Sequence, residues 1–306
     1  MTDGRADREG GASAGGDPGG SGAGRHDPVL VDEVVRLLAG RRAVVDVTVG
    51  AGGHAEALLD AGVERVVGLD RDPEAIDLAR ERLAARGERF RAVPGVFSEL
   101  DLALDAPVDG VLYDLGVSSM QLDRPERGFS YRRDAPLDMR MGPGADEEGP
   151  TAADLVNTLS ERELADVIFR FGEEHRSRRV AAAIVRNRPI TTTDQLAGIV
   201  VSAVGRRPGG PHPARRTFQA LRIAVNRELE ELAASLPQAV ALLGPGGRVV
   251  VIAYHSLEDG IVKRAFRDDD RLEILTKKPV VPAAAEVERN PRARSAKLRA
   301  AERKAA

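Results

Sequence analysis

Short apolar runs alternate with helical patterns between residues 43 and 114, and this alternation constrains the fold more than any other feature of the sequence. The runs AVVDVTV, RVVGLD, FRAVPGVF and VDGVLYDL are mostly apolar, as in strands that are buried on both faces. Helical patterns, HAEALLDAG and PEAIDLARERLAARG, follow the first two of them. Strands that alternate with helices predict a parallel sheet with helices on both faces, the doubly wound α/β fold.

The alternation then stops, and the next convincing strand pattern, GGRVVVIAYHS, comes only at residues 246–256. Far more chain lies between than one crossover needs. It contains SERELADVIFRFG, RVAAAIVRN and TTDQLAGIVVSAVG, all with apolar residues at helical spacing. We therefore expect a helical domain at residues 130–211, inserted into an α/β domain made of residues 26–129 and 212–306. Residues 1–25 are rich in Gly, Ala, Asp and Arg and are expected to form a disordered tail.

The ends of several helices can also be predicted. Asp72 and Pro73 suit the N-cap and first turn of one helix. Ser160 and Glu163 have the spacing of a capping box. The pattern TFQALRIAVNRELEELAASLPQAVALL predicts a single helix over residues 217–243, ending at the turn GPGG.

The composition of the chain excludes several classes of protein. It contains no cysteine, which rules out disulfides and cysteine-based metal sites. No run approaches about eighteen apolar residues, and the segment MTDGRADREGGASAGG lacks the apolar centre of a secretory signal. We therefore expect a cytoplasmic protein that does not enter membranes.

Arginine clusters contrast with the overall charge of the chain. The formal net charge is -3, which argues against a protein that coats nucleic acid by bulk electrostatics. Arginines nevertheless cluster at residues 176–179, 213–216 and 289–304, and together these clusters favour an anionic partner. Aromatic residues make up only 3% of the chain, so a broad platform for stacking single-stranded nucleic acid is not expected.

A glycine-rich segment, VGAGGHAEAL, follows the first predicted strand. Gly50, Gly52 and Gly53 would let the backbone approach a ligand at the carboxyl ends of the strands, where open α/β sheets bind ligands. The second strand ends in Asp70, whose carboxylate could accept hydrogen bonds from both hydroxyls of a ribose. Nucleotide-dependent oxidoreductases share these features, so they do not by themselves identify the cofactor. No second histidine lies at ligand spacing from His54, and we expect no metal.

Longer motifs resemble one family closely. DVTVGAGGH (46–54), GLDRDPEAI (68–76) and DLGVSSMQLDRPERGFSYRRDAPLDMRM (114–141) resemble the ribosomal RNA small subunit methyltransferase H family, also called MraW-like. HDPVLVDEVV (26–35) and GGRVVVIAYHSLEDGIVKR (246–264) are among the motifs that extend the resemblance to most of the chain. The resemblance implies a class I, Rossmann-like methyltransferase that uses S-adenosylmethionine. Its implied substrate is N4 of a cytidine in the decoding region of 16S ribosomal RNA, within the small ribosomal subunit.

Positions that match the family's motifs are implied to form the cofactor site. They are Gly52, Gly53 and His54 beside the methionine part, Asp70 at the ribose, Phe97 at the adenine, and Asp114 and Gln121 to complete the set. An RNA substrate must be held through its phosphates while the target base enters the pocket. We therefore expect RNA contacts from Arg215, Arg216, Arg292 and Arg294.

The reaction itself suggests two catalytic candidates. Cytosine N4 is a poor nucleophile, so the enzyme should accept hydrogen bonds from the amino group and hold it in line with the methyl group. Many amino-methyltransferases place an Asn/Asp-Pro-Pro-aromatic motif at the end of the fourth strand for this purpose. Here the sequence is Asp114-Leu115-Gly116-Val117, and either the Asp114 carboxylate or the Leu115 carbonyl could accept, unless Asp114 serves the cofactor alone. His255, after the fifth strand, could position the base or be a structural histidine.

Two alternatives compete with this interpretation. A nucleotide-dependent oxidoreductase is favoured only by the glycine-rich segment and Asp70. A non-catalytic RNA-binding module or ribosome assembly factor would need the arginine clusters but no methyl donor. The sequence does not indicate an oligomeric state.

Overall fold

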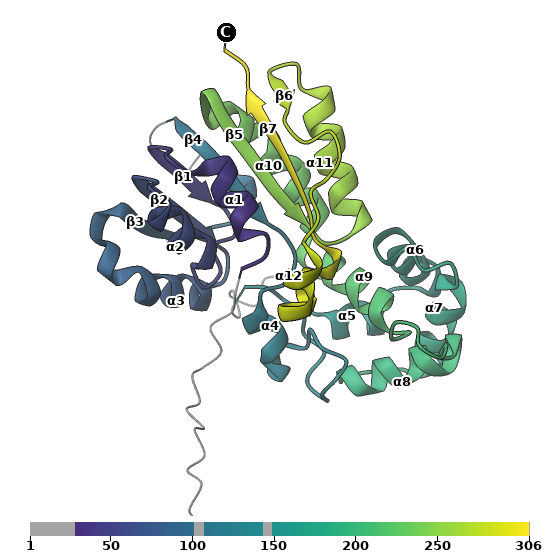
Figure 1. Ribbon diagram of the computed structural model, residues 1–306. Helices are drawn as coiled ribbons and strands as arrows, with labels where there is room; N and C mark the ends of the chain where they lie inside the picture. The colour runs from purple at the N-terminus through teal and green to yellow at the C-terminus, as the bar shows by residue number, and fades with distance from the viewer. Residues whose placement is uncertain (1–27, 101–106, 143–148, 306) are drawn as a thin grey trace, which may run out of the picture.

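Seven strands form a mixed sheet at the centre of the computed structural model, which describes residues 28–100, 107–142 and 149–305 (Figure 1). They are β1 (Ala43–Asp46), β2 (Arg65–Asp70), β3 (Phe90–Pro94), β4 (Val108–Asp114), β5 (Leu243–Ala253), β6 (Leu272–Ile274) and β7 (Lys297–Arg303). Their order is β3-β2-β1-β4-β5-β7-β6. The strands from β3 to β5 are parallel, whereas β7 is antiparallel to both of its neighbours. The predicted doubly wound α/β fold is confirmed.

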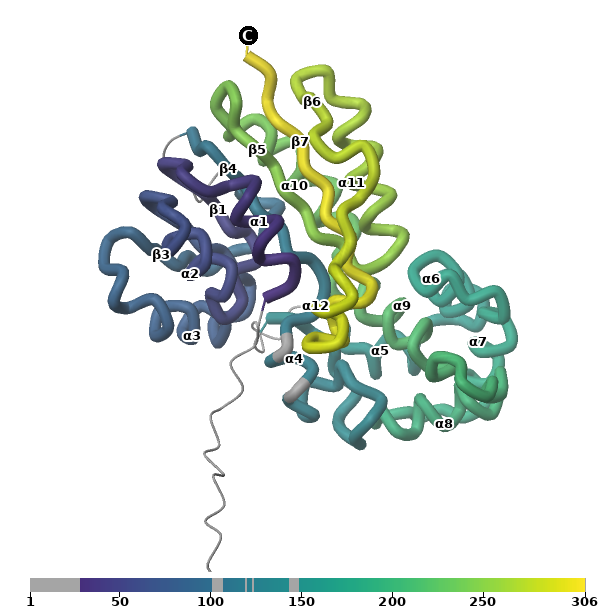
Figure 2. The backbone as a smooth tube through the Cα atoms, in the orientation of Figure 1, coloured from purple at the N-terminus to yellow at the C-terminus, as the bar shows by residue number. Residues whose placement is uncertain are grey.

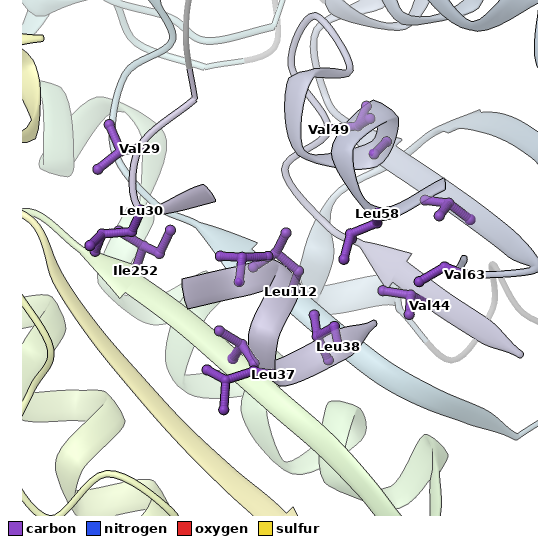
Figure 3. Packing of buried hydrophobic residues seen from close by; sticks show 14 of the residues in the cluster. Val29, Leu30, Leu37, Leu38, Val44, Val49, Leu58, Val63, Leu112 and Ile252 are labelled. Carbon is purple, nitrogen blue, oxygen red and sulfur yellow. The ribbon is translucent and has the colours of Figure 1, made fainter. Parts of the chain in front are cut away.

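Helices cover both faces of the sheet. Successive residues of a strand point to opposite faces, so Val44 packs with one set of helices and Val45 with the other. The first face is covered by α1 (Val31–Leu38), α2 (Gly53–Asp60) and α3 (Pro73–Leu83), and the second by α10 (Glu228–Leu242) and α11 (Ser256–Asp268). Figure 3 shows the first core, where Leu38 of α1 gathers with Leu112 of β4.

The predicted helix starts are confirmed by side-chain hydrogen bonds. The Asp72 carboxylate accepts a hydrogen bond from the backbone of the first turn of α3, which contains Pro73. Ser160 and Glu163 form the predicted capping box at the start of α6 (Glu161–Gly172). Such caps satisfy N–H groups that have no partner within the helix.

A group of helices lies between β4 and β5 in the chain and beside the sheet in space (Figure 1). This helical unit comprises α5 (Ala152–Thr158), α6, α7 (Ser177–Arg186) and α8 (Thr193–Val204). Their buried residues form a separate core that also includes Phe218 of α9 (Arg215–Asn226). Gly172 permits close contact between α6 and α9, because a Cβ atom there would lie 2.5 Å from the Arg216 carbonyl oxygen. The limits 130–211 of the inserted domain stay a prediction, although this core extends beyond them into α9.

The single helix predicted for residues 217–243 is wrong. The chain turns at Arg227, which has a left-handed backbone conformation (φ 52°, ψ 32°) and separates α9 from α10. The adjacent Asn226 is buried, donates a hydrogen bond to the Met139 carbonyl (2.7 Å) and accepts one from Met141 N–H (2.8 Å). These bonds hold the end of α9 to the segment that contains Met139 and Met141, and α10 starts after the turn.

The described chain also contains smaller elements, among them 3-10 helices at Ala84–Arg89, Phe97–Glu99, Pro125–Arg127 and Pro291–Ser295. The shorter helices are α4 (Ser119–Asp123) and α12 (Ala284–Arg289), and β5 begins at Leu243 and ends at Ala253 instead of spanning the predicted residues 246–256. Figure 2 shows the C-terminal segment with α12 beside the beginning of α1, where Leu30 N–H donates to Glu286 Oε1 (2.7 Å). The tail predicted at residues 1–25 lies outside the described residues. Within the described ranges, no helix is both long enough and apolar enough to cross a bilayer.

Candidate active site

A cleft of about 1620 Å³ opens at the carboxyl ends of the central strands. Its walls come from the sheet, from residues 115–132 after β4 and from α9. Of the predicted site residues, it is lined by Gly53, His54, Asp70, Phe97, Asp114, Gln121, Arg215, His255, Arg292 and Arg294. Gly52 and Arg216 do not line it. Most of the predicted residues therefore gather in one place, although they come from distant parts of the chain.

The glycine-rich segment after β1 forms a tight turn into α2. Gly50 and Gly52 have positive φ angles of +50° and +79°. A Cβ atom at Gly52 would lie 3.1 Å from the Leu83 side chain and 3.4 Å from Ala79, so this glycine packs against α3. Gly50 N–H donates to Asp70 Oδ2 (2.9 Å) and ties the turn to the end of β2. Contact of Gly52 with a cofactor stays a prediction, and only its backbone could make that contact.

Asp70 presents its carboxylate at the end of β2. Its two oxygens accept one hydrogen bond each, from Gly50 N–H and from Asp72 N–H, both at 2.9 Å. Burial raises the pKa of Asp70 to about 6, although these hydrogen bonds oppose the shift. A carboxylate has about four lone-pair sites, so sites remain for hydroxyl donors. The Phe97 ring lines the same cleft and packs edge to face with Tyr113 (6.1 Å between centroids).

Asp114 ends β4 with its carboxylate at the cleft. Tyr254 Oη donates to Asp114 Oδ1 (2.8 Å), His54 Nε2 lies 3.4 Å from Oδ2, and the backbone N–H of Asp114 donates to Thr48 Oγ1 (2.7 Å). Burial alone would lower the pKa of His54, but the Asp114 carboxylate raises it above its ordinary value, which favours a proton on the ring. The Asp114 side chain is still 24% exposed. It is therefore held in a defined orientation and remains accessible to a substrate.

Tyr254 is a site residue that the sequence analysis missed. Besides its bond to Asp114, its ring covers Gly116, where a Cβ atom would lie 3.3 Å from the ring. Gly116 also has a φ of +98°, so glycine suits this turn in both conformation and space. Tyr254 directly precedes the predicted His255, but nothing in the strand pattern distinguishes it from a residue that only packs.

His255 caps the start of α11. Its Nδ1 accepts a hydrogen bond from Glu258 N–H (3.4 Å), and its Nε2 lies 3.1 Å from Glu258 Oε1. Burial disfavours the charged form of Glu258, yet the hydrogen bond and charge of His255 hold the pKa of this carboxyl below its ordinary value. Both ring nitrogens of His255 therefore face Glu258, which favours the structural interpretation, and its catalytic role stays a prediction.

Glu228, His255 and Glu258 bring three potential metal-ligand atoms within 4.8 Å of one another. Arg222 donates to both carboxylate oxygens of Glu228, at 2.8 Å each. Glu258 accepts the N–H groups of Tyr254 (2.7 Å) and His255 (3.3 Å). Both carboxylates thus already have protein partners, and the expectation of no metal stays a prediction.

The arginines predicted to bind RNA differ in their surroundings. Arg215, Arg292 and Arg294 line the cleft. Arg216 does not, and its guanidinium lies 3.8 Å from Glu174. Its ion pair and its position outside the cleft lining make Arg216 the weakest of the four candidates.

Comparisons with known proteins identify the family of the chain. The family model described as the MraW methylase family matches residues 23–304. The ribosomal RNA small subunit methyltransferase H of Synechococcus sp. (strain JA-3-3Ab) is 52% identical over 294 residues, covering 91% of this chain and 94% of that protein. The protein of the same name from Sorangium cellulosum (strain So ce56) is 53% identical over 289 residues, with 91% of each chain covered. The solved rRNA methylase from Streptococcus thermophilus aligns with 90% of this chain and 94% of its own at 12% identity, with a TM-score of 0.44.

The chain is of the class of S-adenosylmethionine-dependent methyltransferases. Its sheet and its cleft at the carboxyl ends of the strands correspond to this class. The chain belongs to the MraW methylase family, and its cofactor is S-adenosylmethionine. This membership excludes the nucleotide-dependent oxidoreductase that the glycine-rich segment and Asp70 allowed.

Proposed function

We propose that the protein transfers a methyl group from S-adenosylmethionine to N4 of a cytidine in the decoding region of 16S ribosomal RNA, within the small ribosomal subunit. The observation that carries the proposal is the Asp114 carboxylate, oriented by Tyr254 and His54 at the cleft and still open to a substrate. The names of the relatives support a ribosomal RNA of the small subunit as substrate. The arginines that line the cleft suit RNA phosphates.

The cleft fits the cofactor at the positions that the family resemblance implies. Asp70 has lone pairs free for the ribose hydroxyls, and Phe97 offers a ring for the adenine. Gly53 and His54 would lie against the methionine part. Gln121 lines the cleft and is only 6% exposed, and it would complete the site together with Asp114. S-adenosylmethionine supplies a methyl group bonded to a positively charged sulfur. The remaining tasks of the reaction fall to the residues of this chain.

Asp114 is suited to hold the reacting amine and to take its proton. The lone pair of cytosine N4 is delocalised into the ring, and a hydrogen-bond acceptor at the amino group directs that pair outward and draws off the proton as the new bond forms. Tyr254 and His54 use only part of the lone-pair capacity of the Asp114 carboxylate, so it can still accept from an amine. The Leu115 carbonyl is the second candidate acceptor at the same turn.

A methylation assay with purified small subunits tests the proposal. Small subunits and stripped 16S RNA that both lack the modification are incubated with labelled S-adenosylmethionine, with and without enzyme. We expect the label as N4-methylcytidine in a decoding-region fragment, identified by mass spectrometry, and only when enzyme is present. Label on another base or on protein, or no label on either substrate, would contradict the proposal.

The affinity for S-adenosylmethionine is expected to fall below pH 6. The pKa of Asp70 is about 6, so its carboxyl is ionised above that pH and protonated below it, where it loses acceptor sites for the ribose. Kd measured by calorimetric titration should rise about tenfold between pH 7.5 and pH 5. Asp70→Asn should bind weakly at every pH and lack this dependence.

The same variant identifies the titrating group. Asp46, whose pKa burial raises to about 7, and His54, whose pKa Asp114 holds above its ordinary value, both remain in Asp70→Asn. A pH dependence of cofactor affinity that persists in Asp70→Asn would therefore assign the titration to these two groups and contradict the role given to Asp70.

A further inference from the structure

Three aromatic rings in contact with one another lie between the core of the helical unit and the cleft. The Tyr131 ring stacks on the His212 ring, with centroids 4.5 Å apart and planes at 11°, and it also packs edge to face with Phe218 at 5.4 Å. Phe218 is only 4% exposed, whereas Tyr131 and His212 are half-buried, and all three line the cleft that holds Asp114. Because aromatic residues make up only 3% of the chain, such a stack inside the cleft is conspicuous.

Cationic side chains line the same cleft as this stack. Arg132, Arg206 and Arg215 are exposed and line the same cleft, and Arg206 Nη2 lies 3.3 Å from His212 Nε2. Within the described part of the chain, none of these three guanidinium groups forms an ion pair with a carboxylate, in contrast to Arg216 beside Glu174. Charges that the protein does not compensate at a cleft are suited to an anionic ligand.

The His212 ring is suited to stacking in its neutral form. Partial burial and the charge of Arg206 hold the pKa of His212 below its ordinary value. At neutral pH the ring is therefore uncharged, and it lines the cleft with the Arg206 guanidinium beside it. A flat apolar surface flanked by guanidinium groups matches a nucleobase with its phosphates.

We propose that Tyr131 and His212 form a stacking subsite for the base of a nucleotide that flanks the target cytidine, with Arg132, Arg206 and Arg215 at the adjoining phosphates. The inference rests on the proposed function, because it assumes that the cytidine belongs to an RNA strand. An enzyme that draws a base out of its stack must hold the neighbouring nucleotides, and stacking on an aromatic ring does so without a requirement for a particular base.

Binding of the enzyme to unmodified small subunits, measured at several salt concentrations, tests the subsite. Tyr131→Leu keeps an apolar side chain against Phe218 but removes the ring, and should raise Kd about tenfold without changing the salt dependence. Tyr131→Phe keeps the ring and should recover most of the affinity. Replacing Arg132, Arg206 and Arg215 together by alanine should reduce the slope of log K against log salt by about 2.

The control and a second variant keep the test decisive. Arg162→Ala removes an exposed arginine of α6 that lies outside the cleft and outside the arginine clusters, and should leave Kd and slope unchanged. His212→Ala provides an independent loss of the stack if Tyr131→Leu is poorly folded. Wild-type affinity in a folded Tyr131→Leu or His212→Ala, together with normal binding of S-adenosylmethionine, would overturn the subsite. If the wild-type enzyme still methylates small subunits, only the subsite fails and the proposed function stands.

Discussion

Replacement of Asp114 by asparagine is expected to lower the turnover number about 100-fold at saturating S-adenosylmethionine and small subunits. Asparagine keeps the shape of the side chain and can still accept the Tyr254 hydroxyl, but its neutral amide cannot take up a proton or carry the charge that faces His54. Initial rates of methylation give the turnover number, and titration of the same variant gives its cofactor affinity. Turnover equal to that of the wild type would leave Asp114 as a cofactor ligand only.

Tyr254→Phe is the matched companion of this variant. It removes only the hydroxyl that donates to Asp114 Oδ1 and keeps the ring that covers Gly116. Loss of one hydrogen bond to a charged group should lower turnover about tenfold, a smaller loss than in Asp114→Asn. Equal losses in the two variants would mean that the orientation of the Asp114 carboxylate, rather than its charge, limits the reaction.

The five parallel strands β1 to β5 could be predicted from the sequence because their cause is local, whereas the sequence analysis did not predict β6 and β7. Strands buried on both faces must be apolar along their whole length, and Val44 and Val45 pack on opposite faces for this reason. The cap of Asp72 on α3 likewise depends on neighbouring residues alone. The break at Arg227 could not be predicted, because Asn226 finds its partners 85 and 87 residues away in the chain. No glycine or proline marks this turn in the sequence.

The candidate site likewise contains residues that the sequence could indicate and contacts that it could not. Asp70 and Asp114 end predicted strands, and His54 follows the glycine-rich segment after the first strand; ligands of open α/β sheets bind at these positions, so the sequence could indicate the three residues. The contact of Tyr254 with Asp114 spans 140 residues, and it depends on the pairing of β4 with β5. The stack of Tyr131 on His212 depends on tertiary packing within the helical unit. Neither contact can be predicted from residue type and spacing.

Replacement of Asn226 by alanine is expected to lower the free energy of unfolding by about 3 kcal/mol. Asn226 is 4% exposed, and its side chain pairs with the Met139 carbonyl and Met141 N–H. Alanine would leave both buried backbone groups without these partners, and each such group costs roughly 1–3 kcal/mol. Urea unfolding gives the difference. Asn187→Ala is the control, because Asn187 is exposed and its amide donates to the Ala183 carbonyl of its own helix (2.7 Å), so a similar loss in both variants would contradict the argument.

The same substitution should also weaken cofactor binding, because Asn226 supports a connection to the cofactor side of the cleft. Arg127 donates to the Arg140 and Met141 carbonyls (3.2 and 2.9 Å) and pairs with Asp72 at 3.0 Å, two residues after Asp70. Met141 is the residue whose N–H Asn226 holds, so its release would loosen the anchor of Arg127. We expect a rise of a few-fold in Kd for S-adenosylmethionine in Asn226→Ala at temperatures where the variant is folded, whereas Asn187→Ala should bind as the wild type does. An unchanged Kd in the destabilised variant would show that the helical unit and the cofactor site are held independently.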